Sequence, residues 1–227
     1  MPKRLLLFDI DSTLINTGGA GDKSLKRVIQ QRYGTDDDLH DIEIAGRTDI
    51  GIIVSILKKY GTETTGGNVE AFLDDYLAHL AALLPQLQGS VLPGMLEILT
   101  RMKTKPDRVI GLLTGNIQKG AKLKLGRYGL WEFFEFGAFA DDHQDRNELG
   151  AFARQRAREK HGHEFEGADI DVIGDTGHDV ACGKVVGART IAVATGSWSR
   201  ERLAASQPDY LFDDFSDVTG VLSALNW

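Results

Sequence analysis

The chain has 227 residues, 42% of them hydrophobic, and a formal net charge of −7. This length suits one large domain or a core with an inserted module, and the acidic balance argues against nucleic acid or an anionic membrane as a partner. Cys182 is the only cysteine, so we expect no intrachain disulfide. No apolar run approaches the ~20 residues of a membrane span, and no signal-peptide pattern opens the chain. We therefore expect a soluble cytoplasmic protein.

Short apolar runs predict a set of buried strands. The first run, RLLLFD at 4–9, is followed by runs at 108–114, 169–175 and 189–195, with a weaker one at 209–212. Each run is continuous rather than alternating. This pattern is typical of strands that are covered on both faces.

Amphipathic stretches between these runs predict helices. They span Pro93–Lys103, Gln118–Tyr128 and Asn147–His161, where apolar residues recur at helical spacing. Strands that alternate with helices favour a parallel sheet with helices on both faces. The sequence therefore predicts an α/β fold with a doubly wound parallel sheet.

The segment from 17 to 89 contains no strand-like run of comparable strength and reads as helical. It is bounded by two glycines at 18–19 and by QGSVLPG at 88–94. We therefore predict a catalytic core of residues 1–16 and 90–227 with a helical insertion of residues 17–89. A single domain with an extra helical layer is the alternative. The helical candidates within the insertion are Gly21–Tyr33, Thr48–Tyr60 and Val69–Leu87.

Polar residues follow the predicted strands at their carboxyl ends, where parallel α/β sheets bind ligands. The first strand leads into Asp9 and Asp11, the second into Thr114, and the third into Asp175 and Asp179. Two carboxylates ~4 Å apart repel by about 4 kcal/mol even at an effective dielectric constant of 20. Such a cluster calls for a cation, and oxygen ligands suit a hard ion such as Mg²⁺.

One of the first two carboxylates is a candidate nucleophile. If the backbone bends after Asp9, one carboxylate of the Asp9–Asp11 pair can attack phosphorus while the other moves a proton. Thr114 precedes a Gly115–Asn116 turn that opens a predicted helix, and free backbone amides at such a helix start attract phosphate.

Three short motifs now point to a known family. FDIDST (8–13), LLTGN (112–116) and GDTGHD (174–179) resemble motifs I, II and IV of the haloacid dehalogenase superfamily, in the same order and at the ends of predicted strands. The likeness covers nearly the whole chain. Within the superfamily, the chain is most similar to the phosphoglycolate phosphatase-like branch with a C1 cap. This resemblance implies that the helical insertion closes over the site and selects the substrate.

The resemblance implies roles for the aspartates. Asp9 would become phosphorylated, and Asp11 would protonate the leaving oxygen and then activate water. Asp9, the backbone carbonyl of Asp11 and Asp175 would hold Mg²⁺, with Asp179 in support. Thr114, Gly115 and Asn116 would hold the phosphate.

Motif III of the family supplies a cation, usually a lysine upstream of motif IV. The stretch FADDHQDRNELGAFARQRA contains no lysine, and Arg146 is the closest match by position. Arginine keeps the charge and offers a bidentate fork to phosphate. Lys119 and Lys122, just after motif II, are the fallback candidates.

The insertion contains one further candidate, AGRTD at 45–49. Gly46 could let the backbone approach a ligand, and Arg47 could bind a substrate carboxylate or a second phosphate. Alternatively, Thr48 or Asp49 simply starts a helix and the Arg47 side chain is solvated.

The leading hypothesis is a Mg²⁺-dependent phosphatase acting on a small phosphorylated metabolite, as a monomer or homodimer. A phosphosugar mutase resembling β-phosphoglucomutase would share every core residue, although the serine-arginine loop expected for it is not found. A noncatalytic module that binds phosphorylated ligands is the third possibility, and it would more naturally have lost Asp9 or Asp11.

Overall fold

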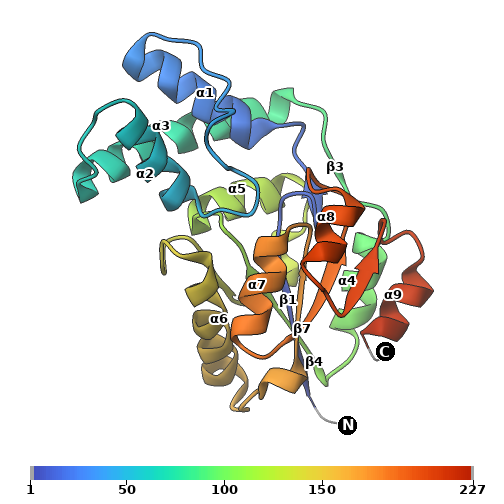
Figure 1. The fold of residues 1–227 in the computed structure, drawn as a ribbon. Coiled ribbons are helices and arrows are strands. Elements are labelled where there is room, and N and C mark those ends of the chain that lie inside the picture. The colour runs from blue at the N-terminus through green and yellow to red at the C-terminus, as the bar shows by residue number, and fades with distance from the viewer. Residues whose placement is uncertain (1–2, 226–227) are drawn as a thin grey trace.

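The computed structural model describes residues 3–225, and a six-stranded parallel sheet forms its centre (Figure 1). The strand order is β5-β4-β1-β6-β7-β8, so β1 is central, with β4 on one side and β6 on the other. The predicted doubly wound α/β fold is confirmed. The strands are β1 (Arg4–Phe8), β4 (Arg108–Leu113), β5 (Gly137–Ala138), β6 (Ile170–Gly174), β7 (Arg189–Val193) and β8 (Tyr210–Phe212).

Both faces of the sheet are buried under helices, as the continuous apolar runs predict. In β1, Leu6 and Phe8 belong to one hydrophobic cluster, whereas Leu5 and Leu7 belong to another, because alternate side chains point to opposite faces. The first cluster includes residues of α4 (Met95–Lys103), α5 (Gln118–Arg127) and α9 (Val218–Ala224). The second includes residues of α6 (Arg146–His161) and α7 (Gly177–Val185).

Shorter elements complete the core. Helix α8 (Arg200–Ala205) packs Leu203 against Ala192 of β7. Single 3₁₀ turns lie at Trp131–Phe133 and Gly167–Asp169. Cys182 is buried on α7.

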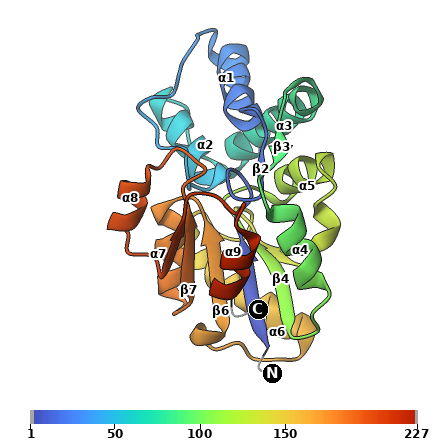
Figure 2. The ribbon, with the colours of Figure 1, turned by 90° about the vertical axis from the view of Figure 1, so that its right-hand side faces the viewer.

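Residues 17–89, called the helical segment below, build a third hydrophobic cluster of their own from α1 (Ala20–Tyr33), α2 (Asp49–Lys59) and α3 (Gly66–Leu83). Thr48 caps α2, its Oγ1 accepting a hydrogen bond from the Gly51 N–H. A 3₁₀ turn at Leu84–Gln86 follows α3. The views of Figures 1 and 2 agree that these helices lie beyond the carboxyl ends of the strands.

Two short antiparallel strands join the helical segment to the rest of the chain. In this pair, β2 (Ile15–Asn16) lies beside β3 (Ser90–Val91). Both crossings into the helical segment therefore run side by side. Within residues 3–225, no helix combines the length and the apolar character that a membrane crossing needs.

Candidate active site

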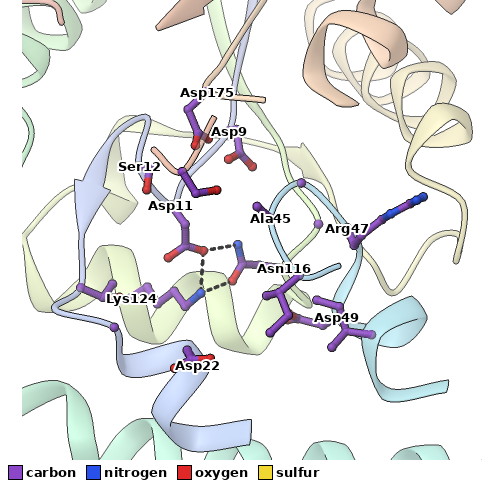
Figure 3. A pocket seen from close by; sticks show the side chains of 18 of the residues that line it. Asp9, Asp11, Ser12, Asp22, Ala45, Arg47, Asp49, Asn116, Lys124 and Asp175 are labelled. Carbon is purple, nitrogen blue, oxygen red and sulfur yellow. Dashed lines mark hydrogen bonds and ion pairs between the residues drawn. The ribbon is translucent and has the colours of Figure 1, made fainter. Parts of the chain in front are cut away.

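Three carboxylates from separate parts of the sequence meet at the carboxyl end of the sheet. Asp9 follows β1, Asp175 follows β6, and Asp179 lies in the first turn of α7. One carboxylate oxygen from each lies within 4.8 Å of the other two, and all three residues are buried. Figure 3 shows Asp9 and Asp175 close together at the pocket wall. The structure therefore brings these predicted site residues together.

The backbone leaves the direction of β1 immediately after Asp9. The Asp9 N–H still bonds the Ile173 carbonyl of β6, at 2.9 Å. Ser12 then adopts a left-handed conformation (φ 59°), and its N–H bonds the Ile15 carbonyl at 2.8 Å. This turn separates the Asp11 side chain from that of Asp9, which is the bend that the sequence suggests.

Asp179 is fixed by the start of α7. Its Oδ2 accepts a hydrogen bond from the Thr176 N–H at 2.9 Å, and Thr176 Oγ1 in turn accepts from the Asp179 N–H, forming a capping box. A Cβ at Gly174 would lie only 2.1 Å from Asp179 Cγ. Glycine at 174 is therefore a steric requirement for this carboxylate position.

Arg146, the first residue of α6, supplies the cation of the cluster. Its side chain is only 7% exposed, and its Nη2 donates to Asp9 Oδ1 at 3.0 Å and also to Asp179 Oδ1. Its Nη1 donates to the Gly46 carbonyl of the helical segment at 3.2 Å. The residue expected at the motif III position thus contacts both the core carboxylates and the helical segment. Lys119 and Lys122, the fallback candidates, are exposed.

The electrostatic balance of the cluster is negative. Burial raises the pKa of Asp9 to about 6, even though Arg146 acts in the opposite direction. Burial, together with Asp179 and Asp9, raises the pKa of Asp175 well above its usual range. When all three buried carboxylates are ionised, the one guanidinium leaves negative charge uncompensated, and the donors are all oxygens. This donor set fits a hard divalent cation.

Asp11 belongs to a second network, which the sequence reading did not anticipate (Figure 3). Lys124 Nζ lies 2.6 Å from Asp11 Oδ2 and 2.6 Å from Asn116 Oδ1. Asn116 Nδ2 donates to Asp11 Oδ2 at 2.9 Å and to Thr114 Oγ1 at 2.9 Å. Lys124 is only 4% exposed, and Asp11 raises the pKa of this lysine against the effect of burial.

Helical periodicity would have predicted that the Lys124 side chain faces the interior of the protein. It lies three and four residues after Ala121 and Gly120, which are buried on the inner face of α5. Lys119 and Lys122 lie off that face. Position on the inner face of α5, rather than closeness to motif II, distinguishes the lysine that enters the pocket.

The motif II turn lies against the helical segment. Asp49 N–H donates to the Gly115 carbonyl at 2.7 Å, and a Cβ at Gly115 would lie 2.2 Å from the Arg47 carbonyl. Nearby, Thr48 Oγ1 donates to the Gln144 carbonyl at 2.6 Å. The loop that precedes α2 is therefore in direct contact with the core.

The Arg47 side chain points away from the carboxylates (Figure 3). Its Nε donates to Glu43 Oε2 at 2.8 Å, and the side chain is 53% exposed. Arg47 is nevertheless one of the residues that line the pocket. A substrate contact by its guanidinium stays a prediction.

A cavity of about 260 Å³ lies between the helical segment and the core. Its core side includes the carboxylates Asp9, Asp11 and Asp175, with Arg146 and Lys124. The helical segment lines the other side, with Asp22, Leu25, Ile44, Asp49, Ile52 and Tyr76 among its residues. The space suits a small molecule whose reacting group faces Asp9.

The family model for haloacid dehalogenase-like hydrolases matches residues 6–193. The chain belongs to this family. The identification made from the three motifs is thereby confirmed.

Relatives of this hydrolase include three proteins with phosphatase names. "Probable phosphatase IndB" of Dickeya dadantii is 28% identical over 98% of this chain and 95% of its own. "Pyrophosphatase PpaX" of Bacillus mycoides is 25% identical over 97% of each chain. "Phosphoglycolate phosphatase" of Synechococcus elongatus is 27% identical over 64% of this chain and 65% of its own.

A solved structure supports the same fold. CbbY from Rhodobacter sphaeroides, determined in complex with phosphate, superposes with a TM-score of 0.77 over 95% of this chain and 96% of that chain, at 16% identity. At this level of identity the match concerns the fold of the hydrolase.

Proposed function

We propose that the protein is a cytoplasmic, Mg²⁺-dependent phosphatase that hydrolyses a small phosphomonoester. The observation that carries the proposal is the group of buried carboxylates around Asp9, with a single guanidinium, at the wall of a cavity between the helical segment and the core. The phosphatase names of the relatives support it. The acidic surface argues against nucleic acid as a substrate.

The carboxylate cluster would hold the Mg²⁺ ion. Its ligands would be Asp9, the backbone carbonyl of Asp11 and Asp175, with Asp179 in support. When bound, the ion supplies positive charge to the phosphoryl oxygens and to the carboxylates around it. The donor set described above is what favours this assignment.

In the first step, a carboxylate oxygen of Asp9 attacks phosphorus and forms an O–P bond. The ester P–O bond breaks, and the leaving oxygen takes a proton from Asp11. Arg146 donates to Asp9 Oδ1, which leaves Oδ2 as the oxygen available for attack. Thr114 and Asn116 would hold the phosphoryl oxygens.

In the second step, Asp11 accepts a proton from water as the water oxygen attacks phosphorus. The O–P bond to Asp9 breaks, and inorganic phosphate and the Asp9 carboxylate are released. Asp11 therefore returns to the protonated form that the next first step requires. Each proton lost by Asp11 in one half of the cycle is regained in the other.

The helical segment, residues 17–89, would act as a cap over a core of residues 1–16 and 90–227. Its own hydrophobic cluster and its contacts at Gly46, Thr48 and Asp49 support this division. Closure of such a cap excludes bulk water from the reacting groups. A monomer or a homodimer is compatible with this arrangement.

Release of inorganic phosphate from p-nitrophenyl phosphate and from a panel of phosphorylated metabolites tests the proposal. We expect turnover with Mg²⁺, its loss with a chelator, and its return when Mg²⁺ is restored. Asp9→Asn is the inactive control. Full activity in the chelator, or in Asp9→Asn, would contradict the mechanism.

Two related activities are outcomes of the same panel. Hydrolysis confined to inorganic pyrophosphate would replace the monoester with a diphosphate as substrate. An isomerised phosphosugar without free phosphate would indicate a mutase. Absence of turnover and of a beryllium fluoride adduct would favour the noncatalytic alternative.

A further inference from the structure

The cavity contains a group of polar side chains that the proposed chemistry does not use. They lie where the helical segment meets the core: Tyr76 comes from α3 and Asp49 from α2, while Lys124 comes from α5 and also contacts Asp11. We call these three residues the roof subsite. Its location places it beside the part of a substrate that departs from phosphorus.

The Tyr76 hydroxyl points to a missing ligand. Tyr76 is only 2% exposed and lines the cavity, yet its hydroxyl makes no hydrogen bond within residues 3–225. The hydroxyl oxygen is open to the cavity rather than sealed in the protein interior, so its partner there is water or a polar group of a ligand. A bound molecule in the cavity would supply that partner.

Asp49 and Lys124 each have hydrogen-bonding capacity to spare. Asp49 Oδ2 accepts from the Ile117 N–H at 2.9 Å, whereas no hydrogen bond reaches Oδ1 in the described part of the chain. Lys124 donates to Asp11 and Asn116, and an ammonium group carries three N–H donors. The subsite therefore retains one acceptor, one donor and one hydroxyl that can act as either.

Gly21 leaves room in front of these groups. A Cβ on Gly21 would lie 3.5 Å from Tyr76 Oη and 3.6 Å from Lys124 Nζ. Both polar atoms thus border the same small space. The absence of a side chain at this position of α1 leaves that space open.

The charges favour a hydroxyl over an anion. A ligand hydroxyl can donate to Asp49 and accept from Lys124 or Tyr76, whereas a carboxylate can only accept. A carboxylate would also be repelled by Asp49 and Asp22, both of which line the cavity. The guanidinium of Arg47, a residue of the helical segment that lines the cavity, is paired with Glu43 and points outward.

We propose that Tyr76, Asp49 and Lys124 bind a hydroxyl group of the departing alcohol, so that the substrate is a phosphomonoester of a hydroxylated alcohol, such as a polyol or sugar, and not of a hydroxy acid. This inference rests on the proposed phosphatase function. It makes the roof subsite a determinant of specificity.

Three small phosphomonoesters test the inference directly. 2-Hydroxyethyl phosphate carries the hydroxyl, ethyl phosphate lacks it, and 2-phosphoglycolate replaces it with a carboxylate. We expect kcat/KM for 2-hydroxyethyl phosphate to exceed that for each of the others by at least about 10-fold. Equal values, or a preference for 2-phosphoglycolate, would overturn the inference.

Variants assign the preference to the subsite. Tyr76→Phe keeps the ring in its hydrophobic cluster and removes only the hydroxyl, so the ratio of kcat/KM for 2-hydroxyethyl over ethyl phosphate should fall to below about 3-fold. Tyr33→Phe is the matched control, because the Tyr33 hydroxyl bonds Thr62 within the helical segment, at 3.1 Å. Its ratio should remain that of the wild type. A ratio unchanged in Tyr76→Phe, or reduced equally in both variants, would overturn the assignment.

Gly21→Ala gives an independent measurement. The added methyl would meet only ordinary van der Waals contacts, so the fold should tolerate it, but it would occupy the space in front of Tyr76 and Lys124. We expect a several-fold higher KM for 2-hydroxyethyl phosphate than for ethyl phosphate, relative to wild type. An unchanged KM for both esters would contradict the location of the subsite.

Hydrolysis of p-nitrophenyl phosphate distinguishes a failure of the roof subsite from a failure of the proposed phosphatase function. Turnover of this ester without selectivity among the three small esters would overturn the roof subsite alone. Absence of turnover with every ester would overturn the proposed function and, with it, the inference.

Discussion

The two ends of the sheet each bury aspartate next to arginine, but in opposite proportions. At the amino end, the fully buried Asp171 receives hydrogen bonds from two arginines, Arg4 (3.0 and 2.9 Å) and Arg189 (2.7 Å). At the carboxyl end, the single Arg146 faces Asp9 and Asp179, with Asp175 beside them. The amino-end group has more arginine than aspartate, whereas the carboxyl-end group has more aspartate than arginine and carries excess negative charge when its carboxylates are ionised.

The ratio of arginine to aspartate distinguishes a structural ion pair from a candidate reactive site better than the burial of the aspartates does. Burial raises the pKa of Asp171 as it does that of Asp9 and Asp175. What differs is the availability of charge and lone pairs for a ligand. At the amino end the two arginines occupy both oxygens of Asp171, and at the carboxyl end oxygens remain for a cation and a phosphoryl group.

The largest expected effect on activity concerns Asp9, the proposed nucleophile. Asp9→Asn should lower kcat by roughly 1,000-fold or more, because an amide cannot form the acyl phosphate. Phosphate release under saturating Mg²⁺ measures this, with thermal unfolding as the check that the variant is folded. A variant that retains a tenth of the activity would remove Asp9 from the chemistry and weaken the contrast between the two ends.

Substitution of Arg146 should have the next largest effect on activity. Arg146→Ala should lower kcat/KM by roughly 100-fold, because it removes the only guanidinium bonded to Asp9 among the described residues. The matched control is Lys119→Ala, on an exposed position of α5, which should stay within about 2-fold of wild type. The reverse ranking would mean that the motif III cation is misplaced.

Asp171→Asn should affect stability instead of chemistry. Without the carboxylate, Arg4 and Arg189 lose their shared partner, and we expect the free energy of unfolding to fall by about 3 kcal/mol. Urea unfolding measures the change, and kcat per folded molecule should remain within about 3-fold of wild type. A large loss of kcat with unchanged stability would reverse the roles assigned to the two ends.

Asp49 lies in a third environment, intermediate between those of Asp171 and Asp9, because its carboxylate accepts a backbone hydrogen bond but has no arginine partner among the described residues. Burial raises its pKa from 3.8 to about 6. Because the folded form binds the proton more tightly than the unfolded chain does, the contribution of Asp49 to wild-type stability should decline as pH rises from about 4 to 6 and then level off. Asp49→Asn lacks this titration and should be more stable than wild type above pH 6, on the order of 1–3 kcal/mol.

Urea unfolding of wild type and Asp49→Asn at several pH values between 4 and 8 gives this comparison. The difference in free energy of unfolding between the two proteins should grow only between about pH 4 and 6. A difference independent of pH would mean that Asp49 titrates normally in the folded protein.

The sequence predicts the parts of the fold that depend on continuous apolar runs. β1, β4, β6 and β7 are found within the predicted runs, because each is long enough to give a strand signal. β5 spans only Gly137–Ala138, and β2 and β3 are equally short, so none has a recognisable pattern. Their pairing is decided by tertiary contacts.

The site likewise contains residues that sequence patterns predict and residues whose positions depend on tertiary contacts. The rule that strand ends converge was sufficient to predict that Asp9 and Asp175 meet, and the resemblance to motif III of the family predicted Arg146 near them. Lys124 and Tyr76 could not be assigned in this way. Their positions depend on how α3 and the loop before α2 pack against α5, which no local pattern encodes.

Arg146 also links substrate entry to the state of the nucleophile. One nitrogen of its guanidinium holds Asp9, and another holds the Gly46 carbonyl of the helical segment. If the proposed cap opens by moving this loop away from the core, the bond to the Gly46 carbonyl would break, while the bonds to Asp9 and Asp179 would remain. One planar guanidinium therefore bridges the loop of the proposed cap and the proposed nucleophile, with no other side chain between them.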